Sequence, residues 1–528
     1  MRLHATSQSC GVLLLALLLS AAPPLRLSAQ AGPDPAQVRQ DVRAYREANE
    51  AKILGELAAL LAIPNNASDL PNIRRNADFL VGLLSQRGIR ARTLELEGSP
   101  PGVYGELMTP GADRTVVFYA HYDGQPVDPS KWVTEAWKPV LRTRSLAEGG
   151  TEIPLPATGQ RVDPESRLYA RSASDDKSPI IAMLAALDAL RAAKVPLSVN
   201  LKFFFEGEEE AGSDHLRAML TRYADLLKAD AWLFFDGPMH QSRRQQISFG
   251  VRGVTGLNLT VFGPTRPLHS GHYGNWAPNP NVLLVHLLAS LRDPDGRITI
   301  AGFYDDVRAP TAAERKAFAS VPSMDEQLRH DLGLAATEAG DAPLTERILL
   351  PALNLGGLSG GPTGAGGANL IGVESSAYID FRLVPNQTPG RVHQLVEAHI
   401  ARQGFHIVRD TPDSTTRLAH ARLIRVTWDE GYPALRTPMD LPVSRAVVQT
   451  AEEMIGGPVI QVPTSGASLG LYHFSEVLKV PLIFVPIVNH DNNQHGQNEN
   501  LRIRNLWDGI ELISGIMARL GINWRSTT

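Results

Sequence analysis

Cysteine is nearly missing from this chain of 528 residues, in which Cys10 is the only one. It precedes an apolar run over residues 12–22, and a lipoprotein cysteine would not stand there. We interpret residues 1–31 as a segment that is removed, so that the mature chain has no thiol. Disulfide bonds, thiolate metal ligands and a cysteine nucleophile are then excluded.

The N-terminal apolar run is also too short to cross a bilayer comfortably. Ala29-Gln30-Ala31 follows it and offers a small-x-small cleavage site. This pattern predicts a secretory signal peptide, so we expect a secreted or periplasmic protein that does not stay at the membrane. An uncleaved anchor is the alternative.

Neither sign of charge is in clear excess. The chain has 51 Lys and Arg against 55 Asp and Glu, which gives a formal net charge of −4. With no basic stripe, nothing indicates nucleic-acid binding. The length is too great for one ordinary hydrophobic core, so we expect two or more domains.

Polar residues suited to metal binding follow four predicted buried strands. These strands cover residues 115–120, 199–205, 231–235 and 481–488. They lead into His121 and Asp123, into the acidic run from Glu206 to Glu210, into Asp236, and into His490 and His495. Open α/β sheets bind ligands at the carboxyl ends of their strands, where these residues would meet.

Each group has a simpler explanation when it is taken alone. The acidic run could be a solvated turn, and Asp175 and Asp176 could favour the start of a helix over residues 180–190. Crowded carboxylates repel one another, however, so solvent, basic side chains or a cation must offset them. Four strands that each deliver His, Asp or Glu therefore favour a shared cation site.

Four motifs occur in the order H-Y-D-G-Q-P (121–126), A-S-D-D-K-S-P (173–179), E-G-E-E-E-A-G-S (206–213) and H-G-Q-N-E (495–499). They resemble the motifs of the carnosinase/aminoacylase family of dinuclear zinc metallopeptidases, and the carnosinase-like dipeptidase branch most of all. The resemblance implies an α/β catalytic domain whose mostly parallel sheet is flanked by helices. An inserted α+β, ferredoxin-like lid would form the dimer interface. We assign residues 32–246 and 431–528 to the catalytic domain and 247–430 to the lid.

The resemblance also implies roles for single residues. Five would be metal ligands: His121 and Asp236 on one ion, Glu210 and His495 on the other, and Asp175 bridging both. Glu209 would be the general base, and Asp123 would orient His121, because a carboxylate on the second imidazole nitrogen fixes the tautomer. A cis peptide bond is implied between Asp175 and Asp176.

Three residues outside these motifs match substrate-binding positions of the family. His269, in L-H-S-G, would reach the active site of the partner subunit and polarise the scissile carbonyl. Arg382 would grip the substrate carboxylate, for which a guanidinium fork is suited, although an ordinary salt bridge is the alternative. Ser468 lies in a turn that would touch the substrate, and this match is weaker.

These observations predict hydrolysis of the amide bond in a dipeptide, or at the C-terminus of a short peptide. A metal-bridged hydroxide would attack, with Glu209 as general base. An N-acyl-amino-acid deacylase is an alternative, and a non-catalytic metal- or solute-binding protein is a more remote one. We expect two Zn²⁺ ions, although Mn²⁺ or Co²⁺ also accept such ligands. The expected partners are the small substrate and a second copy of the chain.

Some positions depart from the family pattern. Ala170, Ser172 and Ser178 stand where the family usually has glycine, and Glu208 stands where it often has an apolar residue. An extra stretch over residues 145–161 is rich in Gly and Pro, and we expect an exposed loop that borders the site. None of these departures removes a predicted ligand.

Overall fold

The computed structural model describes residues 1–2, 4–5, 32–338, 340, 342–466 and 470–524. The predicted signal peptide therefore lies almost wholly outside the described residues. The chain divides into one unit up to Gly32 and another from Pro33 onward, which carries every element named below. None of the described helices is long and apolar enough to cross a membrane.

The largest sheet has eight strands in the order β1-β2-β7-β3-β8-β20-β9-β19. At its centre β7 (Asn200–Glu206), β3 (Thr115–His121), β8 (Ala231–Phe234) and β20 (Leu482–Phe484) are parallel neighbours. These are the four buried strands that the sequence predicts. Because they run in parallel, their carboxyl ends lie at one edge of the sheet.

The other four strands lie toward the two sides of this sheet. They are β1 (Arg90–Leu94), β2 (Gly102–Leu107), β9 (Gln246–Ser248) and β19 (Ile460–Val462). The pairs β1–β2, β2–β7 and β9–β20 are antiparallel, whereas β9–β19 is parallel. The sheet is thus mixed but mostly parallel, as predicted.

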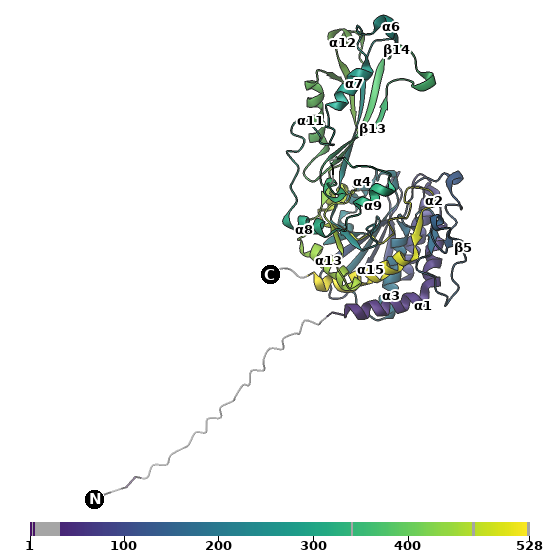
Figure 1. The fold of residues 1–528 in the computed structure, drawn as a ribbon. Coiled ribbons are helices and arrows are strands. Elements are labelled where there is room, and N and C mark those ends of the chain that lie inside the picture. Colours follow the sequence, from purple (N-terminus) through teal and green to yellow (C-terminus); the bar gives the residue numbers. More distant parts are fainter. Residues whose placement is uncertain (3, 6–31, 339, 341, 467–469, 525–528) are drawn as a thin grey trace. The chain divides into compact units, whose positions relative to one another are not determined.

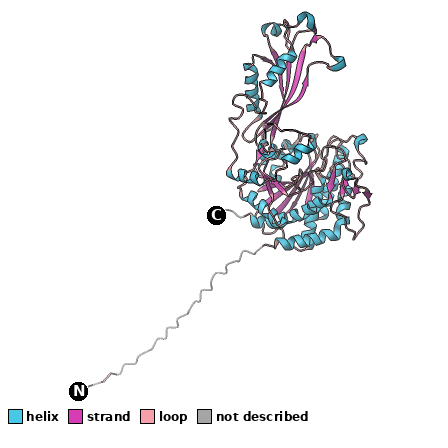
Figure 2. Cartoon of the chain, viewed as in Figure 1, coloured by secondary structure: helices cyan, strands magenta, loops and turns pink. Residues whose placement is uncertain are grey.

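Helices cover both faces of the large sheet because its strands alternate their side chains between two cores. On β3, Val116, Phe118 and Ala120 belong to one core, and Val117 and Tyr119 to the other. The first core is completed by the helices shown in Figures 1 and 2: α1 (Pro35–Leu61), α2 (Leu70–Gln86), α3 (Lys177–Ala192), α13 (Pro442–Ile455) and α15 (Ile503–Asn523). The second is covered by α4 (Leu216–Arg222), α5 (Ala224–Leu227) and α14 (Tyr472–Leu478).

A second sheet has five strands and its own hydrophobic core. Its order is β13 (Ala352–Ser359), β15 (Glu374–Leu383), β11 (Gly253–Phe262), β17 (Leu423–Trp428) and β16 (His406–Val408). The helices α7 (Pro280–Ala289) and α11 (Pro389–Arg402) contribute apolar residues to this core. This is the small sheet with helices that the middle of the chain predicts.

Residues 246–262 form three strands, β9, β10 (Gly250–Val251) and β11, and β9 belongs to the large sheet. Ile247 therefore lies in the catalytic sheet and not in the inserted part. β10 pairs with β18 (Leu435–Arg436), where the chain returns. The two segments approach so closely that a Cβ at Gly250 would collide with the carbonyl of Leu435.

The stretch at 145–161 is not a plain loop. It contains β5 (Glu152–Ile153) and a short 3₁₀ helix (Leu146–Glu148). β5 is the last strand of a sheet ordered β21 (Asn500–Arg502), β6 (Arg167–Tyr169), β4 (Val140–Arg142) and β5.

The remaining elements are short. Between the small sheet's strands lie β12 (Leu268–His269), α6 (Ser270–Tyr273), α8 (Ala312–Ser320), α9 (Asp325–Asp331), α10 (Leu344–Arg347), β14 (Leu370–Ile371) and α12 (Ser414–Ala419). The described part of the segment at 304–350 has three helices, α8, α9 and α10.

Candidate metal centre

Asp175 lies between two histidines at the carboxyl edge of the central strands. His121, the last residue of β3, places Nε2 2.9 Å from Asp175 Oδ1. His495 places its own Nε2 3.2 Å from Asp175 Oδ2 and 3.3 Å from Glu210 Oε2. One carboxylate therefore faces both imidazoles, the arrangement that a bridging ligand requires.

Two overlapping groups of donors could each hold a cation. His121, Asp175 and Glu210 form one, and His121, Asp176 and Asp236 form the other, with the ligand atoms of each group within 4.8 Å of one another. Four of the five predicted ligands are therefore in these groups, and His495 adjoins the first. Asp176 was not among the predicted ligands. Its buried Oδ1 has no hydrogen-bond partner in the described part of the chain.

The loop that carries these aspartates has an unusual backbone. The peptide bond between Asp175 and Asp176 is cis, as the resemblance implies. Ser172, which replaces a usual glycine, has a φ of 61°, in the left-handed region that glycine adopts without cost. The loop at Ser172 therefore has a backbone shape that glycine would adopt more readily than serine.

Several groups of this cluster have raised pKa values. Burial, together with the charge of Asp175, raises the pKa of Glu210 to about 7 and that of Asp236 to about 6. A hydrogen bond with Asp175 raises the pKa of His495 to about 9. Divalent cations would displace the protons of these groups, since metal ligands bind deprotonated. The mixed imidazole and carboxylate donors fit zinc.

Asp123 joins two of the loops that carry the cluster. Its Oδ1 accepts a hydrogen bond from the Glu209 N–H (3.1 Å), and its Oδ2 accepts one from the Glu210 N–H (3.0 Å). Oδ1 also lies 3.4 Å from His121 Nδ1. Both His121 and Asp123 are fully buried, so these contacts fix the end of β3 relative to the acidic run.

The carboxylates of the acidic run point in different directions. Glu206 accepts hydrogen bonds from Tyr119 Oη (2.7 Å) and Ser213 Oγ (2.6 Å), and burial raises its pKa to about 7. Glu208 accepts one from the His215 N–H (2.8 Å). These two support the loop, whereas Glu209 and Glu210 face the cluster. Glu209 Oε2 lies 3.9 Å from His121 Nε2, and burial raises the pKa of Glu209 well above its usual value.

Glu499 is a supporting residue to which sequence reasoning gave no role. Its fully buried carboxylate accepts hydrogen bonds from the N–H groups of Ser172 (2.8 Å), Ser174 (2.9 Å) and Asp175 (2.9 Å). It also pairs with Arg171 (2.9 Å), which donates to the carbonyl of Gly496 beside His495. Glu499 thus ties the Asp175 loop to the His495 loop, and its place in the H-G-Q-N-E motif was the available signal.

We expect Glu499→Gln to lower metal affinity by about 10- to 100-fold, the usual cost of losing a residue that supports a ligand. The amide cannot accept all three backbone N–H groups, so the loop of Asp175 would shift. Competition with a chelator measures the affinity. Glu208→Gln is the control, because it removes a buried carboxylate that faces away from the ligands. Equal affinities in Glu499→Gln and the wild type would show that the loop is held by other contacts.

The cluster opens into a cavity of about 1460 Å³. Asp175, Glu209, Glu210, Asp236 and His495 line it. The described lining residues include none from the stretch at 145–161, so this stretch does not border the cavity.

The residues predicted to contact substrate are not gathered at this cavity. Neither His269 nor Arg382 is among its described lining residues. His269 is exposed, and its Nδ1 accepts a hydrogen bond from the Gly271 N–H (3.1 Å). Arg382 Nε donates a hydrogen bond to Asp380 Oδ2 (2.9 Å). This contact is the ordinary salt bridge that the sequence leaves open as the alternative to substrate binding. Ser468 lies outside the described residues.

Known proteins resemble this chain over most of its length. The Cys-Gly metallodipeptidase dug1 of Schizosaccharomyces pombe is 28% identical over 473 residues, which are 86% of this chain and 93% of that protein. The Beta-Ala-His dipeptidase of Homo sapiens is 26% identical over 445 residues, 80% of this chain and 78% of its own.

Solved structures of peptidases share the fold of this chain. The M20 family metallo-carboxypeptidase Sso-CP2 from Sulfolobus solfataricus superposes with a TM-score of 0.71 at 27% identity, covering 89% of this chain and 99% of its own. Human carnosine dipeptidase 1 shares the fold with a TM-score of 0.69 at 22% identity. The superposition covers 93% of this chain and 100% of that structure. The model of peptidase family M20/M25/M40 matches residues 117–519. With that match over most of its length, this chain belongs to peptidase family M20/M25/M40.

Proposed function

We propose that this protein is a metallopeptidase that hydrolyses dipeptides or removes the C-terminal residue of short peptides. The observation that carries the proposal is the convergence of His121, Asp175, Glu210, Asp236 and His495 beside Glu209. The names of the relatives, two dipeptidases and a carboxypeptidase, support this substrate class.

When bound, two divalent cations, with zinc favoured, would polarise the scissile carbonyl and lower the pKa of a water molecule. Glu209 lines the cavity, and its Oε2 lies 3.9 Å from His121 Nε2, beyond hydrogen-bond distance, so its carboxylate is placed to take the proton of the attacking water. The same carboxyl group can then protonate the departing amine. Burial raises its pKa, which helps it to hold that proton between the two steps.

We further propose a homodimer formed through the five-stranded sheet. Apolar side chains exposed on that sheet support it: Leu355 (49% exposed), Leu358 (62%) and Tyr378 (37%). In the dimer, His269 of one chain would stabilise the developing oxyanion in the other. Arg382 would exchange Asp380 for the substrate carboxylate.

We also propose that the protein acts outside the cytoplasm. The apolar run at 12–22 and the sequence Ala29-Gln30-Ala31 support export to the periplasm or the medium. The domain limit at 430 and the end of the signal peptide at 31 stay predictions.

A panel of dipeptides and N-acyl-amino acids tests the substrate class. We expect the metal-loaded protein to hydrolyse free dipeptides with a higher kcat/KM than the matching N-acyl-amino acids. The opposite order would favour the deacylase. A protein that holds its metal ions and hydrolyses neither class would be a binding protein, although Glu209 would then have no purpose.

A further inference from the structure

The cavity beside the metal cluster is larger than a dipeptide needs. Its volume is about 1460 Å³, whereas pockets for drug-sized ligands measure about 300–1,000 Å³. The ligand residues occupy only one part of its wall. The remaining wall must therefore accommodate a group of the substrate beyond the scissile bond.

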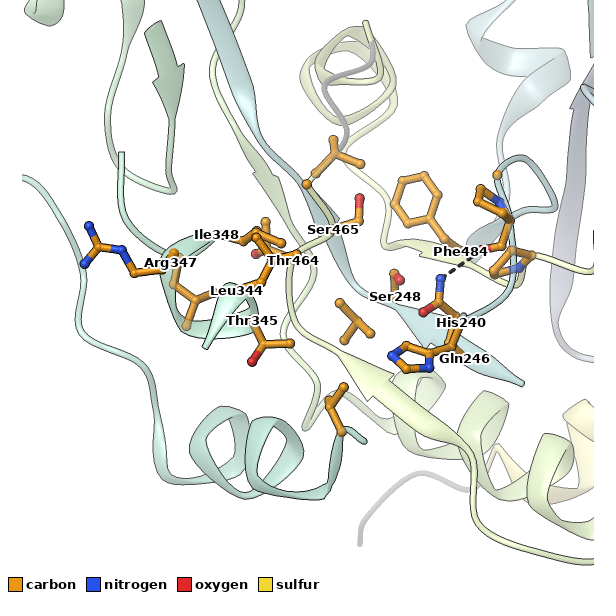
Figure 3. Close-up of a pocket in the computed structure, with 18 of the residues that line it drawn as sticks. His240, Gln246, Ser248, Leu344, Thr345, Arg347, Ile348, Thr464, Ser465 and Phe484 are labelled. Atoms are coloured by element: carbon orange, nitrogen blue, oxygen red, sulfur yellow. Dashed lines mark hydrogen bonds between the residues drawn. The ribbon is translucent and has the colours of Figure 1, made fainter. Parts of the chain in front are cut away.

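Two parts of the chain far apart in sequence form this remaining wall. From the large sheet come Ser248 on β9 and Phe484 on β20. Leu344 and Ile348 come from the segment at 304–350, which is called the inserted segment below. Figure 3 shows Leu344, Thr345 and Ile348 on one side of the cavity and His240, Ser248 and Phe484 on the other. Leu344, Ile348 and Phe484 are apolar, Thr345 and Ser248 are small hydroxyl residues, and burial lowers the pKa of His240, which favours its neutral form.

The inserted segment is fastened at both of its ends. Near its start, the buried carboxylate of Glu314 pairs with Arg436 of β18 (3.0 Å), and Arg436 also donates to Thr464 Oγ1 (2.6 Å). At its end, Arg252 donates to the carbonyl of Leu350 (2.8 Å). Removing one partner of a buried ion pair is costly, so these contacts hold the segment as a built wall.

We propose that this cavity binds a bulky apolar side chain or acyl group on the amino-terminal side of the scissile bond. The inference rests on the proposed peptidase function, in which Arg382 grips the C-terminal carboxylate. Arg382 is not among the described lining residues but pairs in register with Ala352, two residues beyond the lining residue Leu350, so we place the leaving residue at that end of the cavity. The other half of the substrate is then the part that fills it. Phe-Ala and Leu-Ala belong to the favoured class, and Ala-Phe and Ala-Leu do not.

Kinetics on matched pairs test the inference. We expect the wild type to prefer Phe-Ala to Ala-Phe in kcat/KM. Thr345→Trp fills the cavity and should lower the ratio of kcat/KM for Phe-Ala over Ala-Ala by at least about 10-fold, the scale of discrimination in apolar pockets. Leu332→Trp is the control, since Leu332 is 67% exposed on the same segment and should leave that ratio unchanged.

Calorimetry separates this inference from the proposed function. In a Glu209→Gln background, which retains the cavity without turnover, Phe-Ala should bind more tightly than Ala-Phe, and Thr345→Trp should remove the difference. If the wild type hydrolyses none of the dipeptides but the binding preference persists, the proposed function fails and the cavity assignment stands. Equal binding of Phe-Ala and Ala-Phe, or a preference that survives Thr345→Trp, would overturn the assignment.

Discussion

Glu209→Gln should lower kcat by about 10²- to 10⁴-fold while the protein keeps both metal ions, which is the usual loss for a general base. Glutamine has the same shape but cannot accept the proton of water. Glu209 lines the cavity and belongs to neither group of donors that could hold a cation. Its removal should therefore affect turnover and leave metal content unchanged.

Glu210→Gln is the matched control one residue away. Glu210 lies 3.3 Å from His495 and belongs to a donor group with His121 and Asp175. We expect this variant to lose occupancy of one ion. Metal analysis beside steady-state kinetics measures both effects on the same samples. The reverse pattern would mean that the roles of the two glutamates are exchanged.

Two inactive variants should restore activity when they are mixed, if each active site is shared between chains. Glu209→Ala and His269→Ala proteins should each be nearly inactive alone. In a mixed dimer, one site keeps both residues and the other keeps neither. Random association would make half of the dimers mixed, so co-refolding should recover about a quarter of the wild-type activity.

The physical reason is the position of His269. His269 is not among the described residues that line the cavity of its own chain. It also belongs to neither of the donor groups found in the described part of the chain. A donor can stabilise an oxyanion only from hydrogen-bond distance, so under the proposed dimer a second chain would supply His269. Refolding each variant alone under the same conditions is the control. No recovery in the mixture would place His269 within its own chain's site, or outside catalysis.

The central strands could be predicted because their signal is local. Each is a short apolar run that ends in a His, Asp or Glu, and parallel pairing alone brings those ends together. The predicted ligands His121, Asp175 and Glu210 come from motifs of a few residues. The structure brings all three into one donor group, although the resemblance assigns His121 and Glu210 to different ions.

Other features depend on contacts between distant residues, which no local pattern reveals. Arg436 and Glu314 are separated by 122 positions in the sequence, yet their pairing fixes the wall of the cavity. Glu499 reaches the Asp175 loop across 324 positions. The break between β9 and β11 likewise arises from the returning chain at Leu435, and neither strand's own sequence predicts it.

Metal titration into chelated protein tests most directly whether the cluster is a two-metal catalytic centre. We expect the metal-free protein to be inactive on dipeptides and less stable to heat, because its crowded carboxylates lack the cations that offset them. Activity and melting temperature should rise together as Zn²⁺, Mn²⁺ or Co²⁺ is added, with saturation at about two ions per chain. Full dipeptidase activity in protein shown by metal analysis to hold no divalent ions would contradict this mechanism.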